Sequence, residues 1–187
     1  MIITITGPSG SGKTSIAKTL IEKRPNIRLV VSLTMREPRP SDLPGEYLHN
    51  IPREEFEARK EEFAWITPPI NGKLYGTLKK SLDEALAATH PSLMILIPEK
   101  AAQIREYAEN RGRVLSFYVL SPPEDELRQR MRGRGDSESA IEERLKQREA
   151  WDKDARNSPI PYIFIANDEP DTGIEKAAEE ILKRLRG

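Results

Sequence analysis

The sequence of 187 residues predicts an α/β fold in which helices cover both faces of a parallel β-sheet. Apolar segments suited to strands begin near residues 2, 28, 93, 114 and 162, and helical patterns separate them. The segment 93–97, Leu-Met-Ile-Leu-Ile, is apolar throughout, which is typical of a strand buried on both faces. Apolar residues at helical spacing from Ile174 to Leu185 predict a helix that closes the fold.

A glycine-rich loop follows the first predicted strand, residues 2–6, and precedes a predicted helix over 13–23. Residues 7–14 read Gly-Pro-Ser-Gly-Ser-Gly-Lys-Thr, the pattern G-x-x-x-x-G-K-[ST] of a Walker A phosphate loop. Glycines let backbone N–H groups turn toward phosphate oxygens, and the helix N-terminus favours the same anion. The lysine neutralises the outer phosphates, and the threonine hydroxyl is a ligand for Mg²⁺.

This motif predicts a P-loop NTPase-type sheet that binds ATP and Mg²⁺. The expected ATP-binding residues of the loop are Gly7, Ser9, Gly10, Ser11, Gly12, Lys13 and Thr14, with Lys13 also catalytic and Thr14 also the metal ligand.

Composition excludes several classes of function. The net charge is +0, from 30 basic and 30 acidic residues, whereas a general nucleic-acid binder needs a basic excess. The absence of cysteine excludes disulfides and cysteine-ligated zinc, and the isolated His49 and His90 are expected at the surface. No apolar run approaches a membrane span, and no signal-peptide pattern is present, so we expect a cytoplasmic protein. The oligomeric state stays open.

The segments between the predicted strands suggest one domain with two insertions. We expect a core of residues 1–33, 78–132 and 157–187, an acceptor-binding lobe of residues 34–77 and a lid of residues 133–156, both above the carboxyl edge of the sheet. Further predicted helices cover about 53–63, 78–88, 99–110, 124–134 and 137–153. The apolar run 27–32 is expected as one strand, Pro68-Pro69 as a chain break, and Asn71-Gly72 as a hairpin turn.

Arginines in the first insertion suit a phosphorylated acceptor. Arg36 and Arg39 flank Pro38, which stiffens their loop, and guanidinium groups clamp phosphate through two parallel hydrogen bonds. Residues 32–40, Ser-Leu-Thr-Met-Arg-Glu-Pro-Arg-Pro, followed by Gly45-Glu46-Tyr47, resemble the guanylate kinase family. The resemblance continues through Tyr75-Gly76-Thr77, residues 130–135 (Arg-Met-Arg-Gly-Arg-Gly) and residues 165–168 (Ile-Ala-Asn-Asp), in family order over nearly the whole chain.

The resemblance implies transfer of the γ-phosphoryl group of ATP to a nucleoside monophosphate, with GMP as the expected acceptor. It implies substrate-binding roles for Ser32, Thr34, Arg36, Arg39, Tyr47, Tyr75 and Thr77, an ATP-binding role for Asn167, and catalytic lid roles for Arg134 and Arg144. Arg130 and Arg148 are further candidates; ion pairs with neighbouring glutamates on a solvated helix face explain them equally well.

The sequence departs from the family where a carboxylate reads guanine. Ala64-Trp65-Ile66 follows Glu62-Phe63, and residues 95–99 read Ile-Leu-Ile-Pro-Glu where the family has the pattern D-I-D. Glu99 is the nearby carboxylate, and it suits either a magnesium-bound water or the dipole of a helix N-terminus. A competing interpretation is that Glu61 or Glu62, in a shifted register, reads guanine instead.

Two alternatives to a guanylate kinase therefore remain. The first is an enzyme similar to the ribose 1,5-bisphosphate phosphokinases, which likewise lack these acids and have an element resembling residues 71–76, Asn-Gly-Lys-Leu-Tyr-Gly. The second is a non-catalytic guanylate-kinase-like binding module, against which the intact phosphate loop argues.

Overall fold

A central parallel sheet forms the core of the protein. The computed structural model describes residues 1–70, 72–133, 135–169 and 172–185, the side chains of residues 68–70 and 147 excepted. The sheet order is β2-β7-β1-β8-β9, and every neighbouring pair is parallel. The strands are β2 (Arg28–Leu29), β7 (Ser92–Ile95), β1 (Ile2–Thr6), β8 (Val114–Val119) and β9 (Ile163–Ile165). The predicted α/β fold is confirmed.

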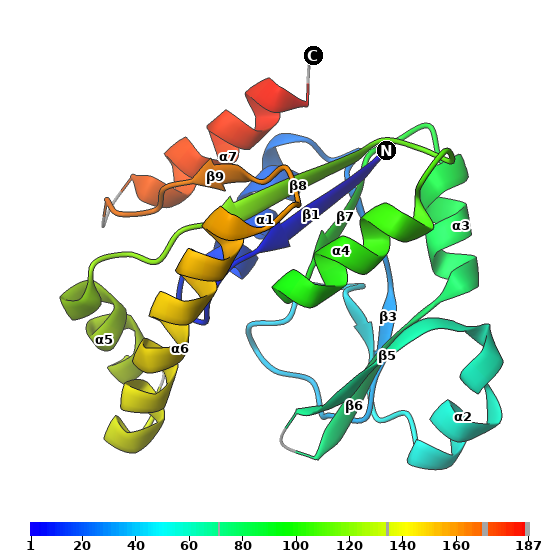
Figure 1. Cartoon of the computed structure of the whole chain (residues 1–187), viewed down its shortest axis with the longest axis horizontal. Coiled ribbons are helices and arrows are strands. Elements are labelled where there is room, and N and C mark those ends of the chain that lie inside the picture. The colour runs from blue at the N-terminus through cyan, green and yellow to red at the C-terminus, as the bar shows by residue number, and fades with distance from the viewer. Residues whose placement is uncertain (71, 134, 170–171, 186–187) are drawn as a thin grey trace.

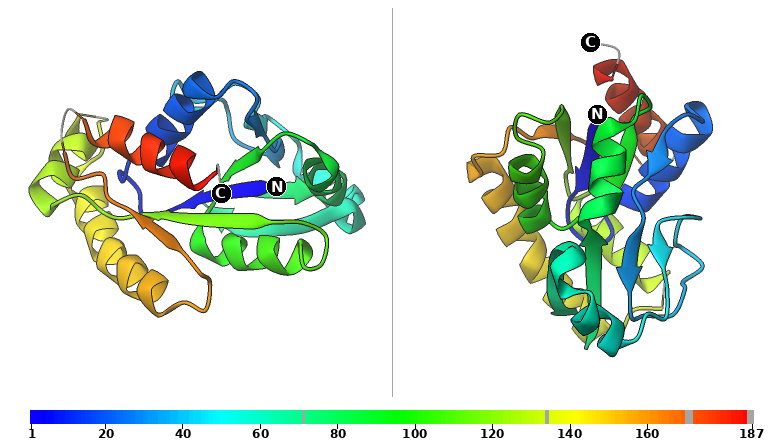
Figure 2. Two further views of the ribbon diagram at one scale, coloured as in Figure 1. Left: turned by 90° about the horizontal axis from the view of Figure 1, so that it is seen from above. Right: turned by 90° about the vertical axis from the view of Figure 1, so that its right-hand side faces the viewer.

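Helices cover both faces of this sheet (Figures 1 and 2). Helices α1 (Lys13–Lys23) and α7 (Gly173–Arg184) lie on one face, where Ile3 and Ile5 of β1 join their apolar side chains in a buried cluster. Helices α3 (Lys79–Ala87) and α4 (Pro98–Tyr107) pack against the other face, where Ile2 contributes to a second cluster. Alternate residues of β1 therefore serve opposite layers, as the period of two in a strand requires.

A second sheet projects from the core and occupies most of residues 32–78. Its order is β4-β3-β6-β5, from β4 (Tyr47–Leu48), β3 (Ser32–Thr34), β6 (Lys73–Leu78) and β5 (Phe63–Ile70). Helix α2 (Arg53–Ala58) and a 3₁₀ turn (Lys60–Glu62) lead into β5. The rings of Phe56 and Phe63 stack with centroids 5.2 Å apart, which fastens α2 to the sheet.

Two helices stand on the other side of the carboxyl edge of the central sheet. Helix α5 (Glu124–Arg132) packs on α6 (Glu138–Asn157) through Leu127, Met131, Ile141 and Leu145. The Ser137 hydroxyl accepts a hydrogen bond from the Ala140 N–H and caps α6. The Tyr118 hydroxyl donates to Asp152 at 2.9 Å, so β8 fixes the C-terminal half of α6.

Three local predictions are wrong. The helix predicted over 53–63 ends at Ala58. Pro68-Pro69 lies inside β5 rather than breaking the chain, because β5 is an edge strand with an irregular register there, where missing N–H donors are tolerated. The run 27–32 contains β2 and the start of β3, which belong to different sheets. The predicted hairpin exists, with Ile70 paired to Lys73, although Asn71 lies outside the described residues.

Candidate functional site

The glycine-rich loop between β1 and α1 has the backbone geometry of a phosphate cradle. Gly7, Gly10 and Gly12 have φ angles of 139°, 86° and 94°, a region that favours glycine. The Lys13 ammonium donates to the carbonyl oxygens of Gly7 and Pro8, at 2.7 Å each. These contacts hold the amine over the loop, where the motif requires a positive charge.

The side chain of Asn167 holds the backbone of this loop. Its side-chain N–H donates to the Ser11 carbonyl at 2.7 Å, and the residue is 1% exposed. It fits between two glycines: a Cβ on Gly12 would lie 2.3 Å from Asn167 Nδ2, and a Cβ on Gly173 would lie 2.5 Å from its Oδ1. The structure thus places Asn167 against the loop backbone, where it positions the phosphate cradle.

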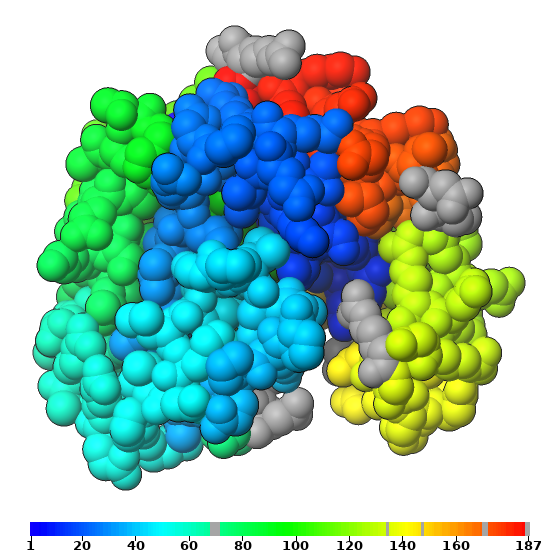
Figure 3. Space-filling model, turned by 180° about the vertical axis from the view of Figure 1, so that it is seen from behind, coloured from blue at the N-terminus to red at the C-terminus, as the bar shows by residue number. Residues whose placement is uncertain are grey.

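A cavity of about 400 Å³ joins the loop to the second sheet. Figure 3 shows the molecule hollowed between the cyan residues of the second sheet and the yellow-green residues of α5 and α6, with dark blue residues of the N-terminal segment at its edge. The cavity is lined by Gly7, Ser9, Lys13, Ser32, Arg36, Arg39, Tyr47, Trp65, Thr67, Tyr75, Gly76, Thr77, Ile95, Leu96, Ile97, Lys100 and Trp151.

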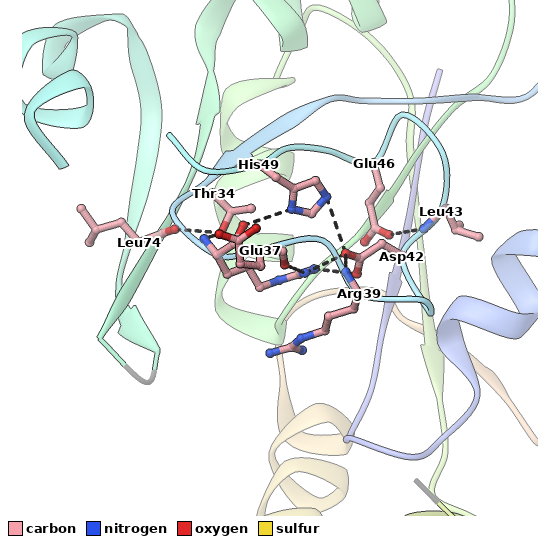
Figure 4. A network of polar contacts seen from close by, with 9 residues as sticks. Thr34, Glu37, Arg39, Asp42, Leu43, Glu46, His49 and Leu74 are labelled. Atoms are coloured by element: carbon pink, nitrogen blue, oxygen red, sulfur yellow. Dashed lines mark hydrogen bonds and ion pairs between the residues drawn. The ribbon is translucent and has the colours of Figure 1, made fainter. Parts of the chain in front are cut away.

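Arg36 is a buried cation of this cavity that is fixed by hydrogen bonds. It is 7% exposed, and its two terminal nitrogens donate to the two oxygens of Asp42 at 2.7 and 2.6 Å. Figure 4 shows Asp42 and His49 in this network, with the guanidinium of Arg39 directed away from the loop. Asp42 also accepts from the Arg39 N–H at 2.8 Å, so one carboxylate orders both predicted phosphate-binding residues.

Two tyrosines lie next to one another on the side of Arg36. The Arg36 guanidinium lies 5.0 Å from the ring centre of Tyr47, and the rings of Tyr47 and Tyr75 meet edge to face at 6.1 Å. Burial, reinforced by the neighbouring Glu46 carboxylate, raises the pKa of Tyr47 above its usual range.

Of the serine and threonine residues with an expected substrate-binding role, two line the cavity and one does not. The hydroxyls of Ser32 and Thr77 are 2.8 Å apart, and both residues line the cavity. Thr34 is fully buried and is not among the lining residues; its hydroxyl donates to the Leu74 carbonyl at 3.1 Å and accepts from the Arg36 N–H. Thr34 thus fixes the start of the arginine loop instead of facing the cavity.

The cavity also has apolar and cationic lining residues outside the arginine loop. Trp65, Ile95 and Ile97 stand there, and Lys100 follows on α4. Among the described lining residues there is no carboxylate. Glu99 lines a different hollow, between α4 and α6, so the structure does not bring it to the phosphate loop. The sequence reasoning missed Asp42, Thr67, Lys100 and Trp151, because no local motif marks them.

The predicted lid arginines lie on α5 and α6. Arg130 pairs with Glu126 and approaches the Gly10 and Asn167 carbonyls at 3.4 and 3.5 Å. Arg144 pairs with Asp136, and Arg148 has a buried terminal nitrogen without a partner among the described residues. None of these three is among the cavity-lining residues, and Arg134 lies outside the described residues.

Thr14 stands in the first turn of α1, half-buried beside the loop. Mg²⁺ at phosphate sites usually takes only one or two protein oxygens and completes its shell with phosphate oxygens and water. One hydroxyl at this place therefore fits the ion. No group of three or more His, Cys, Asp or Glu side chains suited to a metal ion occurs in the part of the chain that the structure describes.

Comparisons with known proteins agree with this architecture. The family model for guanylate kinase matches residues 1–184. A guanylate kinase of Rhizobium etli is 33% identical over 188 residues, covering 100% of this chain and 83% of its own, and one of Xanthomonas campestris is 32% identical over 97% of this chain and 88% of its own. The crystal structure of guanylate kinase from Anaplasma phagocytophilum matches with a TM-score of 0.66 at 25% identity, covering 100% of this chain and 84% of its own. The chain belongs to the guanylate kinase family.

Proposed function

We propose that the protein transfers the γ-phosphoryl group of ATP to a nucleoside monophosphate, with GMP as the acceptor. One observation supports this above all: a single cavity is lined both by the phosphate loop, through Lys13, and by the arginine–tyrosine cluster of the second sheet. Phosphoryl transfer needs a donor and an acceptor held in line, with positive charge around the group in transit. The names of the similar proteins favour GMP among the possible acceptors.

The residues divide the work of the reaction. The loop N–H groups and Lys13 would hold the outer phosphates of ATP, and Thr14 would hold Mg²⁺, which supplies further positive charge to those phosphates. Arg36, Arg39 and the tyrosine hydroxyls would bind the acceptor phosphate. We assign acceptor binding to the lobe of residues 34–77 and exclusion of water to the lid of residues 133–156, which includes Arg144.

The Nε of Arg36 points to the mode of phosphate binding. It is buried and has no hydrogen-bond partner among the described residues, while Asp42 occupies the other edge of the guanidinium. A buried charged donor without a partner is costly, so a ligand that completes it is favoured. A phosphate dianion that reached this edge would satisfy the donor, and Arg36 lines the same cavity as Lys13.

Incubation of the purified protein with ATP, Mg²⁺ and GMP tests the proposal, with ADP and GDP separated by chromatography. We expect both products in equal amounts, and ADP formation near background without an acceptor. Arg39→Ala should raise the KM for GMP, whereas Arg53→Ala, on the surface of α2, should not. ADP formation with ribose 1,5-bisphosphate but not with GMP would replace the proposed acceptor. No ADP formation with either would remove the assignment as an enzyme.

A further inference from the structure

Lys100 is a buried cation that the proposed reaction does not yet use. It stands in the first turn of α4, is 8% exposed and lines the same cavity as Arg36 and Lys13. Its ammonium donates to Gln103 at 2.9 Å, and no carboxylate among the described residues lies within ion-pair distance of it. Burial lowers the pKa of Lys100, against the opposing effect of Glu99. An ammonium has three donors, so two remain for a ligand.

The place of Lys100 in the cavity differs from that of the arginines. Lys100 is one turn before Ile104 on the same face of α4, and Ile104 packs in one cluster with Trp65 and Leu96. Arg36 and Arg39 come from the loop between β3 and β4. Arg36 and Arg39 therefore reach the cavity from this loop, whereas Lys100 reaches it from α4, and Trp65 of β5 lines the same cavity.

The donor at Lys100 suits only some bases. Guanine presents two acceptors, O6 and N7, on one edge, and lysine pairs with both; adenine presents an amino donor in place of O6. Guanine also carries donors, N1–H and the 2-amino group, which a carboxylate would read. The described cavity lining offers hydroxyls but no carboxylate for them.

Resting on the proposed phosphorylation of nucleoside monophosphates, we propose that Lys100 selects the acceptor by donating to the O6 and N7 edge of a 6-oxopurine. No carboxylate among the described lining residues reads the 2-amino group of guanine. The substrate class is therefore the 6-oxopurine monophosphates, GMP and IMP together, with AMP discriminated against. Trp65 supplies an apolar wall against which such a base lies.

Steady-state kinetics with GMP, IMP and AMP test this assignment. For the wild type we expect kcat/KM values for GMP and IMP within about tenfold of each other, since a group that is not hydrogen-bonded contributes little to selectivity. We expect AMP to be at least about a hundredfold poorer, because its amino group faces a donor. Lys100→Met should lower the GMP-to-AMP ratio at least tenfold, mainly through KM for GMP.

Matched measurements separate selection from folding. Lys80→Met removes an exposed lysine of α3 that pairs with Glu84, and it should leave all three ratios unchanged. The melting temperature of Lys100→Met should match that of the wild type or exceed it, because a buried charge with no carboxylate partner among the described residues is removed. The ratio of kcat/KM for GMP to kcat/KM for IMP is measured on the wild type alone. A ratio above about one hundred overturns the inference but does not affect the proposed phosphotransferase function. An unchanged GMP-to-AMP ratio in Lys100→Met also overturns it. Absence of ADP formation with every nucleotide refutes the proposed function itself.

Discussion

Asp42 holds the terminal edge of the Arg36 guanidinium with hydrogen bonds of 2.6 and 2.7 Å, and it does so inside the cavity wall rather than at the surface. The same carboxylate accepts the Arg39 N–H and lies 3.5 Å from the His49 ring. His49 in turn contacts the Arg36 carbonyl at 3.2 Å. A closed ring of contacts therefore sets the direction in which Arg36 presents its remaining donors.

Asp42→Asn should weaken acceptor binding. The amide cannot accept both guanidinium nitrogens, so Arg36 loses its fixed direction, and we expect KM for GMP to rise roughly tenfold or more. The kcat and the KM for ATP should change little. The control is Asp83→Asn, whose carboxylate pairs with Arg111 outside the cavity. A fall in KM for GMP would show that Asp42 competes with the acceptor phosphate instead.

The same pair should make stability depend on pH. Burial raises the pKa of Asp42, but hydrogen bonds from Arg36 and the Arg39 N–H outweigh it, so the folded-state pKa lies below the ordinary value of 3.8. A carboxyl with a depressed pKa contributes stability above its unfolded pKa, and the contribution is lost as pH falls through the folded pKa. The difference in unfolding free energy between wild type and Asp42→Asn should be full near neutral pH and shrink below about pH 4. Urea unfolding at several pH values measures it; a difference that grows with acid would contradict the assignment.

Arg36→Ala and Arg39→Ala should separate binding from stability. Each should raise KM for GMP, by an amount equivalent to about 1.5–3 kcal/mol for a lost charged hydrogen bond. Only Arg36→Ala should also lower the melting temperature, because it leaves Asp42 partly buried without its cation. Arg39 is exposed and its N–H contact survives truncation. Equal melting temperatures for the two variants would show that the ring of contacts does not stabilise the fold.

Lys13→Ala should lower kcat by at least about a hundredfold, because the charge that meets the developing negative charge of the transferred group is removed. The fold should persist, with circular dichroism and melting temperature close to the wild type. Lys18→Ala on the exposed side of the same helix, where Lys18 lies 3.9 Å from Glu22, is the control and should keep full activity. Near-normal turnover of Lys13→Ala would refute the proposed chemistry.

Gly12→Ala should destabilise the protein more than Gly45→Ala. Both glycines have positive φ, 94° and 82°, so both substitutions strain the backbone by about 1–3 kcal/mol. Only at Gly12 does the new Cβ meet a neighbour, Asn167 Nδ2, at 2.3 Å; around Gly45 the space is open. The difference in unfolding free energy between the two variants, measured by chemical denaturation, gives the cost of this clash. Equal losses of unfolding free energy would mean that the Asn167 side chain moves aside at little cost.

The sequence predicted those features that local chemistry dictates. The apolar run of β1, the glycines of the loop and the spacing of α1 and α7 are each visible within a few residues. Strand β5 was missed because prolines normally exclude a strand, and only the sheet order shows that Pro68 and Pro69 lie on an edge. The division between β2 and β3 was missed because one apolar run served two sheets.

For the candidate site too, the sequence predicted the residues that short local motifs mark. Ser32, Arg36, Arg39, Tyr47 and Tyr75 were found because short motifs carry them, and the structure brings all of them to one cavity. Asp42 and Lys100 were missed because their importance comes from tertiary contacts. Asp42 meets a cation six residues away through a folded loop, and Lys100 is buried on α4 where it lines the cavity.

The second sheet leaves the core through two links that are almost as short as a chain permits. Only Val30 and Val31 separate β2 from β3, and α3 begins at Lys79, directly after β6 ends at Leu78. Spin labels at Lys60→Cys and Lys183→Cys, in a chain without other cysteines, would report any change in distance when nucleotides bind. The two links define a hinge axis, so we expect the second sheet to rotate as a rigid body about that axis. Arg36 and Arg39 would then move toward the phosphate loop together, without changing their positions relative to each other.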